Sequence, residues 1–368
     1  MKSSGSLRRF FFAIAAVFLS VILTLGILEL SFWLALHKKL PRETVYFFPD
    51  GNIDTYRGRR LPKNLNWTHV ATISGREVNF RTNSLGFRGG EIQLKKPAGT
   101  TRILMLGDSI VLSAFLPEEE IFANLAEKML ASRHKVEVIN AAVNDIGLRD
   151  EIEILKESGL QMKPDIVFLG FYENDSRPPW GFQNEYYTLP PRLVMASKVL
   201  EKYSYFYKWL WMRVLVTRFK STRFITRTDF VWDWKHGDWR TNQSSYQNLV
   251  KAADLDFGAG WNDKAWDGIY SDLDQLRSIA ARNNFKLVIA IFPVAIQVQS
   301  EFGDDYPQQK MKAYCQKHNI PCLDLLPILK PHKDEDIFID LCHYTPLGNQ
   351  IIAPHVADLL ESAIKAGN

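Results

Sequence analysis

The feature that most constrains this chain is a series of short, uninterrupted apolar runs separated by segments with helical spacing. The first run, residues 103–106, ends at Gly107-Asp108-Ser109. A run this short, bounded by glycine, is typical of a strand buried on both faces of a parallel sheet. The runs that follow are 136–139, 165–171, 286–292 and 321–326, and the predicted helices are 122–130, 148–160, 263–282, 307–318 and 346–364. This alternation predicts an α/β domain with a parallel sheet and helices on both of its faces.

An apolar segment near the N-terminus, residues 10–28, carries no charged side chain, and Glu29 follows it directly. Its length is close to the about 20 residues that cross the hydrocarbon core of a bilayer. A cleavable signal peptide has a shorter apolar region, of about 7–15 residues, followed by a small-residue cleavage site. We therefore predict that residues 1–36 form one transmembrane helix that acts as a signal anchor.

The orientation of this anchor is less sharply determined, because basic residues lie on both sides of it: Lys2, Arg8 and Arg9 before, and Lys38, Lys39 and Arg42 after. The positive-inside count is therefore nearly balanced. A very short basic segment before the first span favours a cytoplasmic N-terminus. We expect a single-pass protein of the cell membrane whose large domain lies on the periplasmic, extracytoplasmic side.

Three further regions follow the anchor. Residues 37–100 form a membrane-proximal lead-in, and residues 101–368 form the α/β domain, which is interrupted by an insertion at about 176–262. Eight of the ten tryptophans lie between Trp180 and Trp266, and a helix is predicted at about 192–220. The aromatic side chains either pack onto the main domain or cover the site and rest on the bilayer, and both arrangements are compatible.

Composition excludes several classes of function. The net charge is +4 with acidic and basic residues mixed, so nothing favours binding to nucleic acid. The three cysteines form neither a disulfide framework nor a zinc motif. Cys315 and Cys322 would pair only in an oxidising compartment, and two free thiols are the simpler alternative. The chain has no HExxH motif, P-loop or dinucleotide fingerprint, so we expect neither a metal nor a cofactor.

Polar residues follow four of the predicted strands and would meet at one edge of the sheet. They are Ser109, the segment 140–145, Asn174 and the segment 340–343. Asp340 precedes His343 by three residues, which lets a carboxylate orient one imidazole nitrogen while the other faces outward. A serine hydroxyl needs such an oriented base to become a nucleophile. The backbone N–H of Ser109, a backbone N–H near Asp145 and the Asn174 amide would supply oxyanion donors.

These residues resemble the SGNH, or GDSL-type, hydrolase family in its membrane-anchored bacterial form. Gly107-Asp108-Ser109, Asn174-Asp175 and Asp340-x-x-His343 are similar to blocks I, III and V of that family. The segment 140–145 is similar to block II, and the segment 83–89 is similar to the stretch that precedes block I in many membrane-anchored members. Each motif alone is weakly specific, but four of them occur in the right order at predicted strand ends.

The resemblance implies a three-layer α/β/α domain of flavodoxin-like type with strand order 2-1-3-4-5. It further implies that Ser109 is the nucleophile, His343 the general base and acid, and Asp340 the group that orients His343. Ser109, Asp145 and Asn174 would form the oxyanion hole. Asp145 departs from the family, which has glycine at this position, and its carboxylate would be unfavourable beside an oxyanion unless it points away.

The chemistry that we expect is serine-dependent hydrolysis of an acyl ester through an acyl-enzyme. The proposed substrate belongs to the cell envelope and is an acylated glycan first and a lipid second. Two alternatives use the same residues or the same fold: an O-acyltransferase that modifies an envelope polysaccharide, and a non-catalytic module that binds carbohydrate or lipid. The sequence predicts no particular oligomeric state.

Overall fold

The computed structural model describes residues 4–36, 60–61, 63–70, 76–144, 146–176, 204–207, 210, 237–253 and 257–366. The chain divides into two compact units: residues 1–46 with 189–225, and residues 47–188 with 226–368. Several predicted features lie outside the described residues: most of the helix at 192–220, five of the insertion's tryptophans and Asp145.

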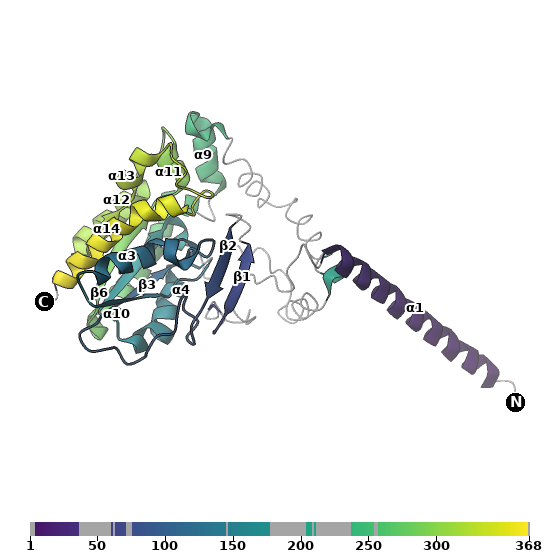
Figure 1. The fold of residues 1–368 in the computed structure, drawn as a ribbon. Coiled ribbons are helices and arrows are strands. Elements are labelled where there is room, and N and C mark those ends of the chain that lie inside the picture. The colour runs from purple at the N-terminus through teal and green to yellow at the C-terminus, as the bar shows by residue number, and fades with distance from the viewer. Residues whose placement is uncertain are drawn as a thin grey trace. The chain divides into compact units, whose positions relative to one another are not determined.

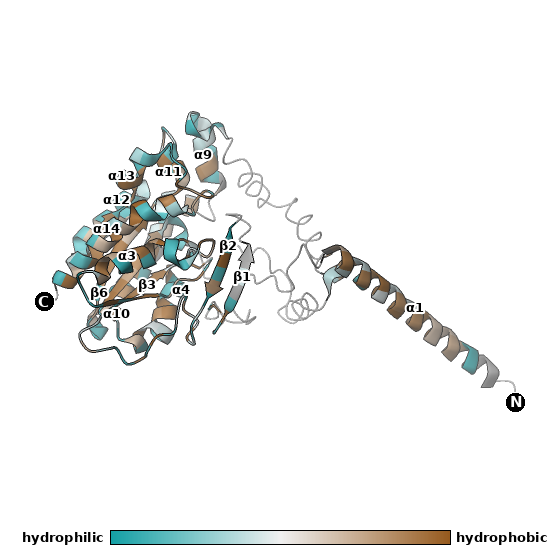
Figure 2. Cartoon of the chain, in the orientation of Figure 1, coloured by the Kyte–Doolittle hydropathy of each residue, from teal (hydrophilic) through white to brown (hydrophobic). Residues whose placement is uncertain are grey.

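The first unit contains the helix α1 (Ser4–Leu36). Residues Arg8–Ala35 of this helix are long and apolar enough to cross a membrane, with a mean hydropathy of 2.7. Figure 2 shows hydrophobic residues along nearly its whole length. The apolar side chains of Phe11, Leu19, Ile27 and Leu34 are each more than half exposed. The helix agrees with the predicted apolar span.

The second unit is built on a parallel five-stranded sheet in the order β4-β3-β5-β6-β7 (Figure 1). Numbered along the sheet's own strands, this is the flavodoxin-like order 2-1-3-4-5, so the predicted fold class is confirmed. The strands are β3 (Thr101–Gly107), β4 (Val136–Asn140), β5 (Ile166–Tyr172), β6 (Lys286–Phe292) and β7 (Cys322–Asp324). All five agree closely with the apolar runs, because each run is a strand covered by helices.

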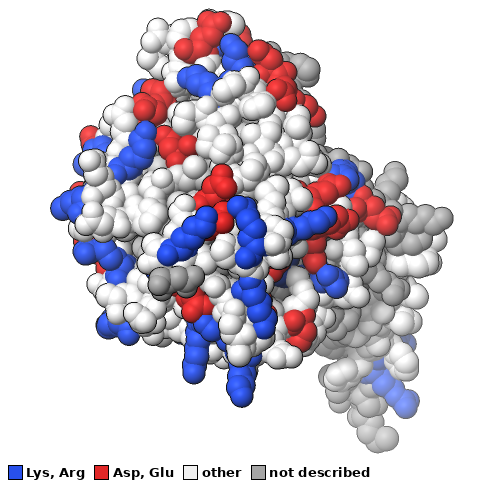
Figure 3. All heavy atoms as spheres, turned by 60° about the vertical axis from the view of Figure 1, so that its left-hand side comes forward, with Lys and Arg blue, Asp and Glu red and all other residues white. Residues whose placement is uncertain are grey.

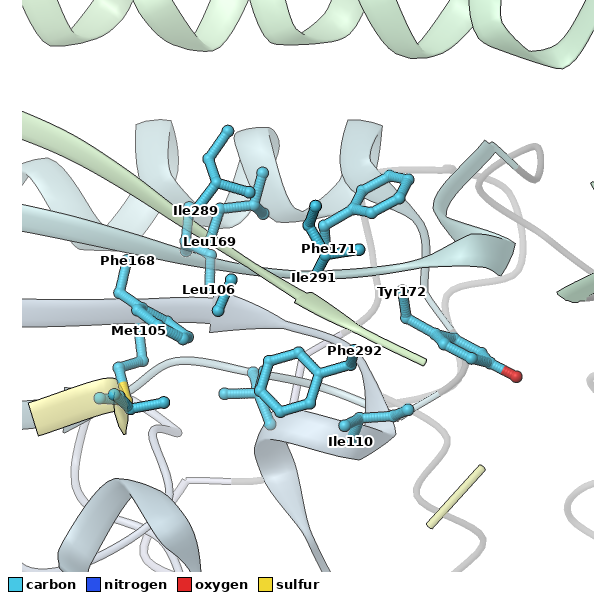
Figure 4. Close-up of a cluster of buried hydrophobic side chains, with 14 of the residues drawn as sticks. Met105, Leu106, Ile110, Phe168, Leu169, Phe171, Tyr172, Ile289, Ile291 and Phe292 are labelled. Carbon is cyan, nitrogen blue, oxygen red and sulfur yellow. The ribbon is translucent and has the colours of Figure 1, made fainter. Parts of the chain in front are cut away.

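Two helical layers cover the sheet. On one face lie α3 (Phe122–Ala131) and α14 (Pro346–Lys365), and on the other lie α4 (Leu148–Ile154), α10 (Asp263–Asn283) and α12 (Tyr306–His318). Side chains of each strand alternate between the layers. Phe168 and Phe292 point to the first face, where both contact Phe122, and Phe171 points to the other, where it contacts Trp266 (Figure 4). These contacts form one continuous core.

Shorter elements connect or extend these layers. The helix predicted over 148–160 is α-helical only to Ile154 and continues as a π-helical turn, η2, and a 3₁₀ turn, η3. The sequence analysis did not predict the hairpin strand β1, whose partner β2 agrees with the extended segment expected at 77–81. The remaining elements are β1 (Asn66–Val70), β2 (Glu77–Arg81), α2 (Ser109–Leu112), η1 (Glu118–Glu120), η2 (Leu155–Gly159), η3 (Leu160–Met162), η4 (Glu173–Ser176), η5 (Asp238–Arg240), α9 (Gln243–Ala252), η6 (Phe257–Trp261), α11 (Ala295–Gln299), α13 (Leu326–Leu329) and η7 (Lys330–His332).

Two glycines at the end of the sheet make room for the short helix α2. Gly107 ends β3 with a φ of 156°, and Gly170 lies beside it on β5. A Cβ atom on Gly107 or Gly170 would lie 2.2 or 2.3 Å from Cγ2 of Val111, a residue of α2. Since real side chains do not approach so closely, glycine at both positions is what allows α2 to lie directly against the strands.

Charged side chains of both signs are interspersed on the molecule. On the face shown in Figure 3, Lys and Arg side chains lie among Asp and Glu side chains rather than in one basic band. Ion pairs between the two signs include Arg133 with Glu361 and Lys310 with Asp263. This distribution agrees with the small net charge of the sequence.

We expect Gly170→Ala to lower the free energy of unfolding by about 1–3 kcal/mol, the usual cost of forcing atoms into a packed core. The added methyl would lie 2.3 Å from Val111 Cγ2 and 3.2 Å from the Phe292 ring. Denaturant unfolding of the purified protein measures this. Gly268→Ala is the control, since this exposed helical glycine has no atom within 4 Å of a new Cβ, and it should raise stability by about 0.5–1 kcal/mol.

The double variant Val111→Ala, Gly170→Ala separates the clash from other effects. The smaller residue at 111 leaves space for the new methyl, so the two changes together should cost less than the sum of the single changes. Equal stability of Gly170→Ala and Gly268→Ala would contradict the packing argument.

Candidate active site

Three of the residues singled out in the sequence are joined by hydrogen bonds in the structure. Ser109, the first residue of α2, places its Oγ 2.8 Å from Nε2 of His343. Nδ1 of the same ring lies 2.7 Å from Oδ2 of Asp340. With Asp340 ionised, Nδ1 donates its proton to the carboxylate, so Nε2 is left to accept the proton of the serine hydroxyl. The arrangement is that of an acid-oriented histidine base beside a serine nucleophile.

The Asp340 carboxylate also shapes the loop that carries the histidine. Its Oδ1 accepts hydrogen bonds from the backbone N–H groups of Cys342, at 2.9 Å, and of His343, at 2.8 Å. The N–H of Ile339 donates to the carbonyl of His343 at 2.7 Å and closes the loop. The imidazole packs edge-on against Phe115, with ring centroids 4.7 Å apart. These contacts hold the ring in one orientation.

This loop is attached to the end of the sheet by residues on either side of His343. The hydroxyl of the buried Tyr344 donates to the carbonyl of Pro293, which follows β6, at 2.7 Å. The N–H of Ala295 donates to the carbonyl of Leu341 at 2.8 Å. Thr345 then caps the N-terminus of α14, since its Oγ1 accepts the N–H of Gly348 at 3.2 Å.

Arg88 holds the other side of the site. It is buried, and its guanidinium donates to the backbone carbonyls of Leu112, of Ser113 at 2.7 Å and of Leu116 at 2.6 Å, all just beyond Ser109. Burial lowers the pKa of Arg88 to about 10, so the group remains charged at neutral pH. The sequence analysis gave this arginine no role, although it lies in the stretch 83–89 that resembles the segment before block I.

Asn174 follows the strand next to the one that Ser109 follows. Gly107 of β3 is paired with Gly170 of β5, so η4, which carries Asn174, begins at the same edge of the sheet as α2. Asn174 is buried. The turn around it is held by Asp175, whose Oδ2 accepts the N–H of Tyr172 at 2.9 Å. The predicted placement of Ser109 and Asn174 at one edge of the sheet is therefore observed.

The segment after β4 also reaches this edge. The Asn140 amide donates to the carbonyl of Val111 at 2.8 Å, and the N–H of Val143 donates to the carbonyl of Gly107 at 3.2 Å. Asp145 lies outside the described residues, so its expected place in the oxyanion hole stays a prediction.

A group of buried acids lies behind the site, and sequence reasoning missed its significance. Asp108, Asp150, Glu151, Glu173 and Asp175 are each at most 2% exposed. Burial, followed by repulsion from Asp175, Asp108 and Asp150, raises the pKa of Glu151 well above its ordinary value. Burial likewise raises the pKa of Glu173. Both shifts favour the protonated, uncharged form of these carboxyls, which reduces the negative charge next to the site.

Asp340 behaves in the opposite way. Burial by itself would raise its pKa, but the charge of His343, the hydrogen bond to that ring and the two backbone N–H donors outweigh burial and lower the pKa to about 2. Asp340 is therefore ionised throughout the neutral range, as a carboxylate that orients a histidine must be.

Within the described part of the chain, one trio of residues brings metal-ligating atoms together: Asp340, Cys342 and His343, whose ligand atoms lie within 4.8 Å of one another. Two of these residues already form the hydrogen-bonded group with Ser109, and Cys342 Sγ lies 3.5 Å from His343 Nδ1. A metal here would compete with Asp340 for that nitrogen. Cys315 and Cys322 are both free thiols in the structure, and contact with Cys315 followed by burial raises the pKa of Cys322.

Neither a family model nor a curated protein matches the sequence. Solved structures similar to the chain include a lipolytic protein of the G-D-S-L family from Veillonella parvula, at 14% identity and a TM-score of 0.35, covering 69% of this chain and 94% of that one. Another is the acetylxylan esterase Axe2 of Geobacillus stearothermophilus, at 11% identity and 0.41, covering 70% and 93%. A third is LAE5, an alpha/beta hydrolase from the metagenome of Lake Arreo, at 12% and 0.42, covering 73% and 97%.

We expect Asp340→Asn to lower the free energy of unfolding by about 2 kcal/mol at pH 7, from the difference between a pKa of about 2 and the ordinary 3.8. Because the pKa is depressed in the folded protein, this stabilisation is complete above about pH 4 and is lost as the pH falls towards 2. Denaturant unfolding of both proteins between pH 7 and pH 2 measures it. The exposed Asp358→Asn is the control, and an equal difference at every pH would contradict the charge argument.

Proposed function

We propose that this protein is a serine-dependent acyl-ester hydrolase that acts through an acyl-enzyme. The observation that carries the proposal is the series of hydrogen bonds from Asp340 through His343 to Ser109, at 2.7 and 2.8 Å. Ser109 would act as the nucleophile, and the imidazole is already oriented to accept the proton of its hydroxyl.

The proposed reaction has two halves. His343 takes the proton of Ser109 as Oγ attacks the carbonyl carbon of the ester, and the protonated ring then gives that proton to the departing alcohol oxygen. Water next attacks the acyl-enzyme, with His343 again taking a proton and returning it to Ser109 Oγ as the free acid leaves. Asp340 stays ionised throughout and stabilises the imidazolium.

Charge that develops on the carbonyl oxygen requires donors at the same edge of the sheet. We assign this role to the backbone N–H of Ser109, the Asn174 amide and a backbone N–H at Asp145. The position of both residues just beyond neighbouring strands supports this assignment, since Ser109 is the first residue of α2 and Asn174 the second residue of η4, at one edge of the sheet. One oxyanion donor typically contributes about 10²–10³ in kcat.

We expect a fluorophosphonate probe to label the wild type and to leave Ser109→Ala unlabelled, because the probe reacts covalently with an activated serine. Labelling followed by in-gel fluorescence and peptide mass spectrometry measures this. Ser132→Ala, which removes an exposed hydroxyl bonded only to the carbonyl of Met129, is the matched control and should label like the wild type. Equal labelling of Ser109→Ala would exclude Ser109 as the nucleophile.

The proposed substrate is an acylated molecule of the cell envelope, with an O-acetylated glycan first and a lipid second. A pocket of about 340 Å³ between α9 and η6 supports the glycan, since Tyr246, Trp261, Gln247 and Asn262 combine aromatic faces with amide groups. It borders η6, and η6 packs against η4: a Cβ on Gly260 would lie 2.8 Å from the Cβ of Glu173, the neighbour of Asn174.

We also propose that α1 anchors the enzyme in the cell membrane, with the α/β unit on the extracytoplasmic side. The apolar span Arg8–Ala35 supports the anchor. The basic residues at its N-terminal end, Lys2, Arg8 and Arg9, support a cytoplasmic N-terminus. An enzyme in this position would meet envelope glycans and lipids rather than cytoplasmic esters.

We expect acetyl esters to be hydrolysed at least tenfold faster, in kcat/KM, than esters of long acyl chains. A series of p-nitrophenyl esters from acetyl to palmitoyl measures this, with Ser109→Ala as the blank. A preference for long acyl chains would instead indicate a lipid substrate. Repeating the acetyl assay with added glycan separates the two enzymatic alternatives. An O-acyltransferase would transfer the acetyl group to sugar, whereas a hydrolase would release acetate. Binding of glycan without turnover of any ester would indicate a non-catalytic binding module.

A further inference from the structure

Glu29 is an acidic residue within the apolar span of α1, and its carboxylate is bonded to a segment far along the chain. Its oxygens accept hydrogen bonds from Ser204 Oγ at 2.6 Å, from the Tyr205 N–H at 2.6 Å and from the Phe206 N–H at 3.3 Å. All of these residues belong to the same compact unit as α1. An ionisable group inside a membrane helix is costly unless it is paired. The three hydrogen bonds to Glu29 therefore indicate that its contact with residues 204–206 has a role in this unit.

The geometry at the partner segment is that of a capped helix start. Residues 205–207 are helical, and Ser204 Oγ, besides donating to Glu29, accepts the N–H of Tyr207 at 2.9 Å. Glu29 thus satisfies the backbone donors at the start of this turn that would otherwise face an apolar environment. Hydrogen bonds to an ionised carboxylate are stronger than those between neutral groups.

Apolar contact reinforces the polar one. Phe32 lies one turn beyond Glu29 on α1, and its ring packs against Phe206 with centroids 5.3 Å apart. Tyr205 is 9% exposed, whereas Leu210, a few residues further on, is 40% exposed. Phe206 therefore packs against α1, whereas the apolar side chain of Leu210 is exposed.

We propose that residues 204–207 and Leu210 belong to a second membrane-contacting element, docked by Glu29 onto the end of α1 at the lipid–water interface. The uncharged residues 10–28 are long enough to span the hydrocarbon core, which places Glu29 and Phe32 at its boundary. Tyr side chains such as that of Tyr205, which have a polar and an apolar end, suit this depth. The partner of the outward face is the bilayer itself.

This inference rests on the proposed anchor but not on the proposed ester hydrolysis. In chain order, residues 204–207 and 210 lie between η4 and η5.

Disulfide crosslinking of the full chain in native membranes tests the docking. In a background with the three native cysteines replaced by serine, we expect Phe32→Cys with Phe206→Cys to crosslink under copper phenanthroline at least tenfold more than Leu34→Cys with Phe206→Cys. Leu34 is 61% exposed and lies about 200° around the helix from Phe32, so it is the matched control. Mass spectrometry of the linked peptides quantifies both pairs, and equal crosslinking would overturn the docking.

Two additional variants test the role of Glu29. Glu29→Ala should reduce the Phe32→Cys, Phe206→Cys crosslink several-fold, and Glu29→Gln, which keeps an acceptor oxygen, should restore part of it. An undiminished crosslink in Glu29→Ala would overturn the role of the carboxylate. Fluorophosphonate labelling of Ser109 in the same samples shows whether the α/β unit is folded, and its failure would concern the proposed hydrolysis rather than this contact.

The membrane contact needs a separate measurement. A nitroxide attached at Leu210→Cys in nanodiscs should be relaxed more by oxygen, which concentrates in lipid, than by a water-soluble nickel complex. A nitroxide at the exposed Ser132→Cys is the aqueous control and should show the reverse. Relaxation dominated by nickel at position 210 would overturn the proposed membrane-contacting element.

Discussion

The position of the candidate nucleophile depends on one packing constraint, the contact of Val111 with the glycines of two adjacent strands. Because neither Gly107 nor Gly170 has a side chain, α2 lies directly on the end of β3 and β5. Two polar contacts then hold α2 from opposite sides: the Asn140 amide bonds the carbonyl of Val111, and Arg88 bonds the carbonyls at the end of the helix. Ser109 is the first residue of α2, so the packing of α2 on the sheet also holds the Ser109 hydroxyl in place.

The histidine reaches the same point from the far end of the chain, and electrostatics rather than packing makes it a base. Four donors and charges converge on Asp340 and keep it ionised, whereas Glu151 and Glu173, buried behind the site with fewer donors, have raised pKa values. The pKa of Asp340, which contacts His343, is thus lowered, and the pKa values of the two buried glutamates are raised, which disfavours further negative charge behind the site. The carboxyl groups shift in opposite directions because their hydrogen-bond donors differ.

The unit that contains α1 also has a carboxylate surrounded by hydrogen-bond donors. Glu29 lies in a helix where an isolated charge would be expensive, and the structure supplies a hydroxyl and two backbone N–H groups from residues 204–206. In both units, therefore, a carboxylate is stabilised by backbone N–H donors arranged around it. Glu29 joins segments distant in sequence, whereas the partners of Asp340 are the nearby Cys342 and His343.

The sequence by itself determined the architecture and most of the candidate site. Buried parallel strands must be apolar on both faces, so uninterrupted apolar runs in the sequence mark the strands. Polar residues that follow these strands must lie at one edge of the sheet. For this reason the sequence alone predicted Ser109, Asn174, Asp340 and His343 as site residues. Tertiary structure alone decided what Arg88, Val111, Glu151 and Glu29 do. Their roles depend on partners far along the chain, 175 residues for Glu29 and Ser204, and local periodicity reports the burial of one element but not which distant group will meet it.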